Sequence, residues 1–132
     1  MNMGFVEHPV EGVAILLWSA DVSQPQRLAT PFFHAAAAAA MDLPVEVYFS
    51  AASVRLLAPG VAERLHAGGV DKSILDAMRE AVAHGAVFFA CSDALQAQGL
   101  AGQALIAECT RRGGAVQFMA RAIDARWRTL VF

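Results

Sequence analysis

Two segments of the chain are apolar along their whole length, and they restrict the possible folds more than any other feature. They span residues 13–18 and 86–91. A strand with one face in water alternates apolar and polar residues, whereas a strand in a parallel sheet with helices on both faces is apolar throughout. The sequence therefore predicts an α/β protein with a mostly parallel sheet, in which these two strands are central.

The other predicted elements alternate in type along the chain. The remaining predicted strands are residues 45–49, 115–119 and 128–132. The predicted helices are residues 26–41, 53–57, 61–66 and 71–84, a short helix that stops at Gly99, and residues 102–112. This order indicates βαβ units, and thus a three-layer α/β/α fold with a mostly parallel five-stranded sheet. The link between residues 119 and 128 is shorter than an ordinary crossover, so the place and direction of the last strand stay open.

The length and composition are those expected of one domain over residues 1–132. The chain is 57% hydrophobic with a mean hydropathy of +0.45, but no apolar run approaches the roughly 18 to 20 residues that span a bilayer. Residues 1–12 carry no Lys or Arg, so a secretory signal is not expected. The apolar excess and the single lysine favour a homo-oligomer, because soluble monomers rarely expose large apolar patches.

Charge, cysteines and motifs exclude several classes of function. The net charge is −2, without a basic run or a basic stripe with interleaved aromatic residues, so nucleic acid is not an expected partner. Two cysteines without a CxxC pair indicate neither a disulfide framework nor a common zinc site, and the expected compartment is the cytosol. The four histidines have no metal-ligand spacing, and GxGxxG, GxxxxGK and GxSxG motifs are absent. The sequence therefore predicts no metal site and no nucleotide site.

Polar residues follow the predicted strands at their carboxyl ends, where sites form in an open parallel sheet. The candidate binding residues are Ser19 and Asp21 after the first strand, Arg27 in the helix that follows, Ser50 after the second strand, and Ser92 and Asp93 after the third.

Cys91 is the candidate nucleophile, because it ends the apolar strand and directly precedes a predicted helix. Either Ser92 or Asp93 is expected to cap that helix. A helix N-terminus favours a thiolate, whereas the carboxylate of Asp93 opposes it unless an arginine, Arg27 or one from a neighbouring subunit, screens that charge. The alternative is that Cys91 is a small buried apolar residue, the usual fate of a free cysteine.

The second cysteine, Cys109, is expected in the core, because it shares a predicted helix face with Leu105 and Ile106. A redox pair of Cys91 and Cys109 would require this helix to direct its thiol toward the wrong end of the strand. The sequence therefore predicts that Cys91 reacts with thiol reagents in the native state and that Cys109 is protected.

The chain resembles the DsrE/DsrF-like family of small sulfur-relay proteins over about residues 12–132. The resemblance rests on the opening strand at residues 13–19, the apolar strand that ends in Cys91, the Cys-Ser-Asp-Ala-Leu segment that begins there, and the terminal strand that ends in Leu-Val-Phe. It implies trimers or hexamers, protein partners that donate and accept sulfur, no cofactor, and a persulfide on Cys91. Asp93 is a departure from the family pattern.

The sequence-level hypothesis is therefore a sulfur carrier, similar to a sulfurtransferase, that passes persulfide sulfur through Cys91 to a protein partner. Two alternatives stay open. In one, the chain is a non-catalytic oligomeric binding or scaffold subunit with an inert Cys91. In the other, it is a thiol redox protein in which Cys91 is oxidised to a sulfenic acid.

Overall fold

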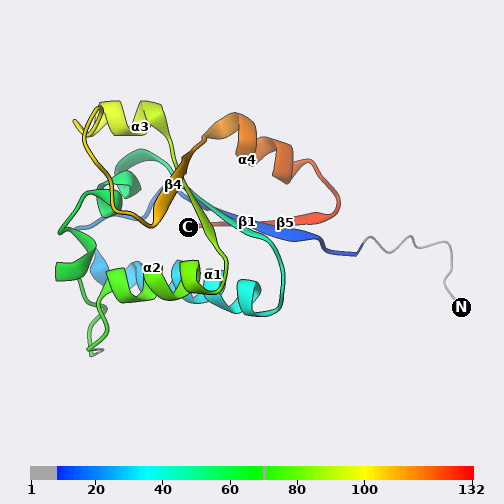
Figure 1. Cartoon of the computed structure of the whole chain (residues 1–132), viewed down its shortest axis with the longest axis horizontal. Coiled ribbons are helices and arrows are strands. Elements are labelled where there is room, and N and C mark those ends of the chain that lie inside the picture. Colours follow the sequence, from blue (N-terminus) through cyan, green and yellow to red (C-terminus); the bar gives the residue numbers. More distant parts are fainter. Residues whose placement is uncertain (1–8, 70) are drawn as a thin grey trace, which may run out of the picture.

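The computed structural model describes residues 9–69 and 71–132, which form one sheet with helices on both sides (Figure 1). The strands are β1 (Gly12–Leu17), β2 (Val45–Phe49), β3 (Val87–Ala90), β4 (Cys109–Arg112) and β5 (Trp127–Val131). They lie in the order β4-β3-β2-β1-β5, and every neighbouring pair is parallel. The predicted α/β/α class with a five-stranded sheet is confirmed, and the sheet is parallel throughout.

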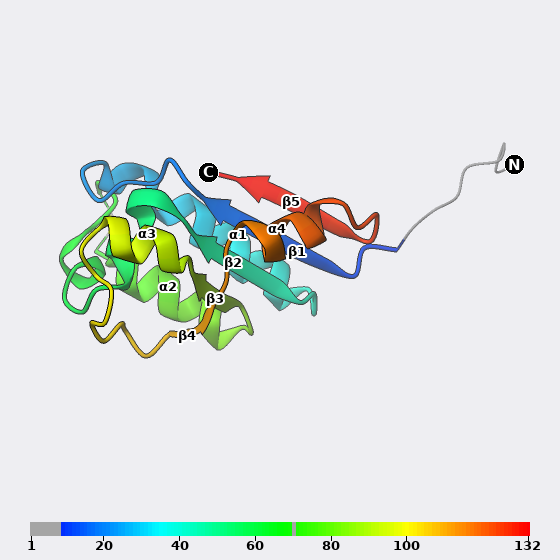
Figure 2. The same cartoon turned by 90° about the horizontal axis from the view of Figure 1, so that it is seen from above.

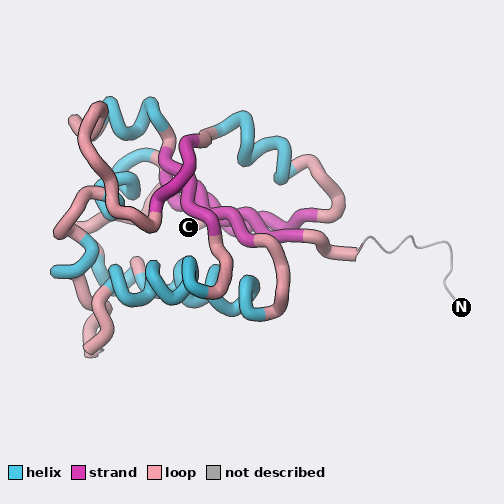
Figure 3. The backbone as a smooth tube through the Cα atoms, viewed as in Figure 1, coloured by secondary structure: helices cyan, strands magenta, loops and turns pink. Residues whose placement is uncertain are grey.

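The helices lie above and below this sheet (Figures 1 and 3). The helical segments are η1 (Pro25–Arg27), α1 (Ala29–Ala40), η2 (Ala51–Leu57), η3 (Ala62–Arg64), α2 (Ile74–Ala83), α3 (Ser92–Ala97) and α4 (Ala115–Ala122). Figure 1 shows α1 and α2 on one side of the sheet and α3 and α4 on the other. The predicted helices at residues 26–41, 53–57, 61–66 and 71–84 correspond to η1 with α1, η2, η3 and α2.

Alternation along each strand divides the side chains between two hydrophobic clusters. In β1, Val13, Ile15 and Leu17 belong to the larger cluster, which α1 and α2 cover, whereas Ala14 belongs to a smaller cluster. Phe118 of α4 packs in that smaller cluster against Tyr48 of β2. Both β1 and β3 are interior strands, as expected from their apolar sequences, and β2 is the middle strand.

Two predicted elements near the C-terminus are wrong. Residues 102–112 do not form a helix, because residues 101–108 are turns and irregular backbone and residues 109–112 form strand β4. Residues 115–119 form the first part of helix α4 instead of a strand. The short apolar run that suggested a strand is compatible with either element. The helix forms because Gln117 caps it, accepting a hydrogen bond from the Gly114 N–H at 3.0 Å, and because Phe118 anchors it on the sheet.

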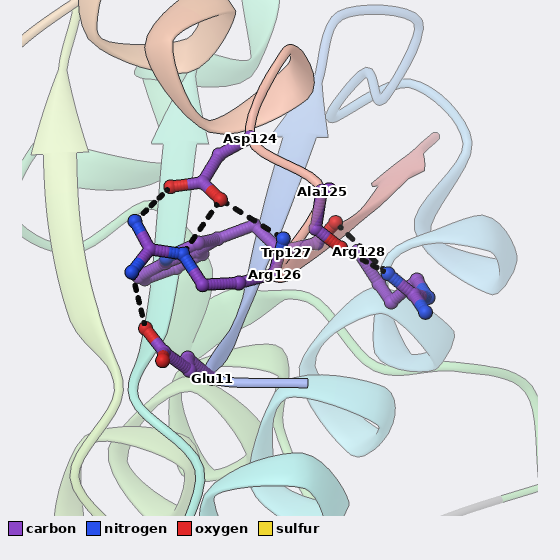
Figure 4. Close-up of polar contacts among 6 residues, drawn as sticks. All are labelled: Glu11, Asp124, Ala125, Arg126, Trp127 and Arg128. Atoms are coloured by element: carbon purple, nitrogen blue, oxygen red, sulfur yellow. Dashed lines mark hydrogen bonds and ion pairs between the residues drawn. The ribbon is translucent and has the colours of Figure 1, made fainter. Parts of the chain in front are cut away.

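Helix α4 therefore provides the last crossover, and it places β5 parallel to β1 at the edge of the sheet (Figure 2). The turn between α4 and β5 is fixed by Asp124, which accepts hydrogen bonds from the backbone N–H of Arg126 at 2.9 Å and from its guanidinium at 3.2 Å (Figure 4). The same guanidinium lies 3.5 Å from a carboxylate oxygen of Glu11, just before β1. This turn thus ties the beginnings of the two paired strands together.

Residues 1–8, which include His8 and most of the segment where a signal was not expected, lie outside the described residues, as does residue 70. Within the described part of the chain, no helix has the length and apolar character needed to cross a membrane.

Candidate functional site

Cys91 lies at the carboxyl edge of the sheet, in the connection between β3 and α3. Its N–H donates to the Phe49 carbonyl of β2 at 3.0 Å, and its own carbonyl accepts from the Leu95 N–H of α3 at 2.9 Å. The residue is therefore fixed by the sheet and by the helix, and its side chain is half-buried. The expectation that Ser92 or Asp93 caps α3 is wrong, because the helix begins at Ser92 and Cys91 itself is the N-cap residue.

Two glycines bring the start of α4 next to this thiol. The Gly113 N–H donates to the Ala90 carbonyl at 3.1 Å, which continues the pairing of β4 with β3. A Cβ on Gly113 would lie 2.8 Å from the ring of Phe89, closer than real Cβ atoms approach, so a side chain is excluded there. A Cβ on Gly114 would lie 3.4 Å from Cys91 Sγ. The backbone at the start of α4 is therefore a wall of the site.

An open cavity of about 440 Å³ lies on one side of Cys91. Ser92 and Asp93 from α3, and Arg112 and Gln117 from β4 and α4, line it together with the thiol. The first turns of both helices border this cavity, and helix N-termini carry partial positive charge. Arg112 and Asp93 add charges of opposite sign to the lining of this cavity, and Nη1 of Arg112 lies 4.0 Å from Sγ of the other cysteine, Cys109.

A second cavity, of about 310 Å³, lies between the start of α4 and the carboxyl ends of β1, β2 and β3. It shares Cys91, Gly113, Gly114 and Ala115 with the open cavity. The other residues that line it are Leu16, Tyr48, Phe49, Ser50, Phe118 and Met119. Cys91 therefore borders two spaces of different character, one open with charged side chains in its lining, the other mostly apolar without charged residues.

The remaining candidate residues do not line either of these two cavities. Ser19 and Arg27 line a separate cavity of about 340 Å³ together with Phe132. Asp21 accepts a hydrogen bond from the Ser23 N–H at 3.0 Å, which shapes a local turn. The structure thus brings Ser50, Ser92 and Asp93 to Cys91, and it places Ser19 and Arg27 together elsewhere.

Sequence reasoning missed Arg112, Gly114 and Gln117, which border the thiol from the opposite side. The reason is that residues 102–112 were assigned to a helix and residues 115–119 to a strand. Neither the carboxyl end of β4 nor the N-terminus of α4 was therefore predicted. The Arg-Arg-Gly-Gly sequence at residues 111–114 is the signal that marks this end, because paired glycines commonly follow a strand where the chain turns.

Cys109 differs from Cys91 in position and surroundings. It lies on the edge strand β4 rather than on a core helix, and it is half-buried. Burial raises the pKa of the Cys109 thiol, and this outweighs the opposing effects of the Arg111 backbone and the Arg112 charge. Cys109 pairs with Phe88, three residues before Cys91. At about 3.3 Å per residue the two Cα atoms are about 10 Å apart along the sheet, too far for a disulfide, which needs less than about 7 Å.

Helix α4 is held on the sheet by an ion pair under its C-terminal half. Arg121 donates to both carboxylate oxygens of Glu46, at 2.8 and 3.0 Å, and its guanidinium lies 3.9 Å from the ring centroid of Trp127. The Tyr48 hydroxyl donates to the same carboxylate at 2.8 Å. Burial alone would raise the pKa of Glu46, but the hydrogen bonds from Arg121 and Tyr48 and the arginine charge lower it overall. This cluster fixes the helix whose first turn borders Cys91.

Metal chemistry has no support among the described side chains. Within residues 9–69 and 71–132, no group of three or more His, Cys, Asp or Glu side chains is placed to hold a metal ion. Cys91 is the nucleophilic group that the two cavities share. The fold and the site thus define a parallel α/β/α protein with one thiol at the carboxyl edge of its sheet.

Comparison with known proteins agrees with this description. Residues 13–132 match the DsrE/DsrF-like family, and the chain belongs to that family, which is associated with sulfur relay. The crystal structure of the ychN protein from E. coli has the same fold, with a TM-score of 0.73 at 16% sequence identity, over 93% of this chain and 100% of the other. No curated protein matches the chain significantly.

Proposed function

We propose that this protein is a sulfur carrier that holds persulfide sulfur on Cys91 and passes it to a protein partner. The observation that carries the proposal is the position of Cys91, a half-buried thiol at the carboxyl edge that borders two cavities. Membership of the DsrE/DsrF-like family supports the same chemistry. The cytosol, where thiols stay reduced, is the compartment in which such a carrier works.

The transfer consists of two exchange steps. The Cys91 thiolate attacks the outer sulfur of a donor persulfide, a new S–S bond forms on Cys91, and the donor thiolate leaves with the electron pair of the broken bond. An acceptor thiolate then attacks the outer sulfur on Cys91, and the Cys91 thiolate leaves. Each attacking thiol gives its proton to solvent and each leaving thiolate is free to take one up, so no oxidant, metal or organic cofactor is needed.

The surroundings of Cys91 support this role physically. The first turns of α3 and α4 favour negative charge in the open cavity, which Arg112 also lines. A persulfide is more acidic than a thiol and is held as an anion, so these groups stabilise the loaded form. The carboxylate of Asp93, which lines the same cavity, opposes this stabilisation of negative charge. Among the described arginines, Arg112 is the one that lines the cavity together with Asp93.

We also propose that the carrier is a homo-oligomer, a trimer or a hexamer. The support is a set of exposed apolar side chains on α4, just after it, and on the edge strand β5. Their exposed fractions are 82% for Val116, 78% for Ile123 and 56% for Val131. Such a patch beside an unpaired strand edge favours burial against another chain. Light scattering at micromolar concentration tests this, and the mass of a monomer would contradict it.

The central experiment is intact mass after incubation with a persulfide donor. We expect the wild-type protein to gain one sulfur atom, the Cys91→Ser variant to gain none, and the Cys109→Ser variant to gain one. Serine is nearly isosteric with cysteine, so both variants are expected to fold, which circular dichroism checks. If the Cys91→Ser variant is loaded as well as wild type, the carrier proposal is wrong.

The same samples distinguish the two alternatives. A Cys91 that resists both the persulfide donor and an alkylating reagent would favour a non-catalytic binding or scaffold subunit. A Cys91 that gains oxygen from peroxide but no sulfur from the donor would favour a thiol redox protein. In that case a disulfide with Cys109 in the same chain is not expected, because the sheet register keeps the two thiols apart.

A further inference from the structure

The cavity between α4 and the sheet adjoins the open one along Cys91 and residues 113–115, and the Cys91 thiol is the nucleophilic group in its wall. In the proposed function, the open cavity is the side from which a donor or acceptor protein approaches the thiol. The second cavity, of about 310 Å³, is at the small end of the range of ligand pockets, which is about 300 to 1,000 Å³. Its walls come from three strands and from α4, so a folded partner has no room there.

The chemistry of these walls selects an apolar occupant. No lining residue is charged. Tyr48 is 2% exposed and Phe118 is 9% exposed, and their two rings form the aromatic part of the inner surface. The ring of Phe49 packs against Phe32 on the other face of the sheet. The Tyr48 hydroxyl already donates to Glu46 at 2.8 Å, which leaves the Ser50 hydroxyl and the Cys91 thiol as the polar side-chain groups that a ligand meets.

The mouth of this cavity is also apolar. Met119, which is 52% exposed, lies on α4 one turn from Ala115, and both residues line the cavity. A flexible thioether at an opening adapts to apolar groups of different shape. A ligand that enters past Met119 reaches Cys91 without crossing the charged groups of the open cavity.

We infer that this cavity is a subsite for the apolar substituent of a small persulfide or thiol that exchanges sulfur with Cys91. The inference rests on the proposed function, and it adds that one of the two exchange partners is a low-molecular-weight sulfur compound with an apolar group of up to about benzyl size. The open cavity then serves the protein partner, so the two partners approach the same sulfur from different sides.

The test uses three neutral methanethiosulfonates that differ in the group they transfer: 2-hydroxyethyl, propyl and benzyl. The Cys91 thiolate attacks the sulfenyl sulfur, the S–S bond to the transferred group forms, and methanesulfinate leaves with the electron pair of the broken bond. Propyl and 2-hydroxyethyl are nearly isosteric, so they differ in polarity and little in size. The reaction rate of each reagent is measured with the Cys109→Ser protein and is divided by the rate of the same reagent with glutathione.

We expect propyl to be transferred roughly tenfold faster than 2-hydroxyethyl, because moving the hydroxyl of the second reagent from water into an apolar cavity is unfavourable. Benzyl should be transferred at least as fast as propyl, because it buries more apolar area. In the benzyl adduct, nuclear Overhauser effects should connect the benzyl protons with the Phe118 ring and the Met119 methyl group. Effects to Gln117 and Arg112 instead would place the group in the open cavity and overturn the inference.

A pair of matched methionine variants, one on α4 and one after α1, locates the effect. Met119→Gln changes the mouth of the cavity without changing charge. It should reduce the ratio of the propyl rate to the 2-hydroxyethyl rate roughly threefold or more. Met41→Gln is the matched control, since Met41 is also an exposed methionine, at 71%, but follows α1 and does not line this cavity. It should leave this ratio within about twofold.

The outcomes separate this inference from the proposed function. Equal normalised rates for all three reagents, with persulfide loading intact, would overturn the subsite and leave the carrier. An equal effect of the two variants would also overturn the subsite. No reaction with any reagent, together with no persulfide loading, would overturn both.

Discussion

The two faces of the sheet are built differently. Helices α1 and α2 cover one face, where Phe32 stacks on Phe49 with ring centroids 6.0 Å apart and lies 5.8 Å from Phe88. That face holds the larger core, which spans most of the chain. The other face has a small cluster of Ala14, Tyr48 and Phe118, an ion pair, and a cavity that reaches Cys91.

This difference indicates which face of the sheet contributes most to stability and which face is available for function. The α1 and α2 face supplies most of the buried apolar area. On the other face, α4 is held by a small apolar cluster and by an ion pair. This leaves a cavity beside Cys91 and exposed apolar side chains on α4. The candidate site and the proposed interface both lie on that side.

The largest expected effect is a core truncation on the α1 and α2 face. Phe32→Ala should lower the free energy of unfolding by about 4 kcal/mol, because it removes a fully buried ring among other aromatic rings. Phe118→Ala, on the α4 face, should cost roughly half as much, about 2 kcal/mol, since Phe118 already borders a cavity. Urea unfolding measures both, and equal losses would break the comparison between the faces.

The next effect concerns the ion pair beneath α4. Glu46→Gln should cost about 1 to 2 kcal/mol at pH 7, a moderate value because the Arg121 side chain is 36% exposed and partly screened by water. The folded-state pKa of Glu46 lies below its usual value of 4.5. Its stabilising contribution is therefore complete above that value and is lost as the pH falls through the lower folded pKa.

Fluorescence of Trp127, which packs on Arg121, reports this change in a Trp18→Phe background. Between about pH 5 and pH 3, wild type should lose stability more steeply than Glu46→Gln. Other carboxyl groups, such as Asp76 and Asp124, also have a lowered pKa because of hydrogen bonds, but they are common to both proteins. Parallel acid profiles for the two proteins would show that the ion pair does not hold α4.

A smaller effect is expected at the Tyr48 hydroxyl. Tyr48→Phe should cost about 1 kcal/mol, because Glu46 loses one of its hydrogen-bond donors while the ring packing is kept. Burial, followed by the hydrogen bond and the charge of Glu46, raises the pKa of Tyr48, so the hydroxyl remains a donor at ordinary pH. The loss should therefore be constant from pH 6 to pH 9 in thermal unfolding. A loss that disappears toward pH 9 would contradict this.

The smallest effect on stability is expected on the outer side of α4. Val116→Ser together with Ile123→Ser should change the free energy of monomer unfolding by less than about 0.5 kcal/mol per substitution, because both side chains are exposed. The same variant should sediment as a smaller species than wild type if these residues form the proposed interface. A large loss of stability without a change in mass would mean that they pack within the chain.

The fold class followed from the sequence because apolar patterns record burial directly. Residues 13–17 and 87–90 are apolar and lie in interior strands, as predicted. The pattern failed in residues 102–119, where β4 is an edge strand of mostly exposed residues and α4 buries mainly Phe118. Strand β4 buries little and leaves little pattern in the sequence, so its type was not determined locally. Helix α4 does have apolar residues at helical spacing, at 115, 116, 118, 119 and 122, and the short window of residues 115–119 was too narrow to distinguish it from a strand.

The sequence by itself determined the parallel sheet, the family resemblance and the position of Cys91 at a carboxyl edge, because each depends on local order along the chain. Only the tertiary structure placed Arg112, Gly114 and Gln117 opposite the thiol and set Arg27 in a different cavity. The physical reason is that these neighbours come from the pairing of β4 with β3 and from the docking of α4 by Phe118 and Arg121. Those are long-range contacts, and no residue in the 91–99 segment specifies them.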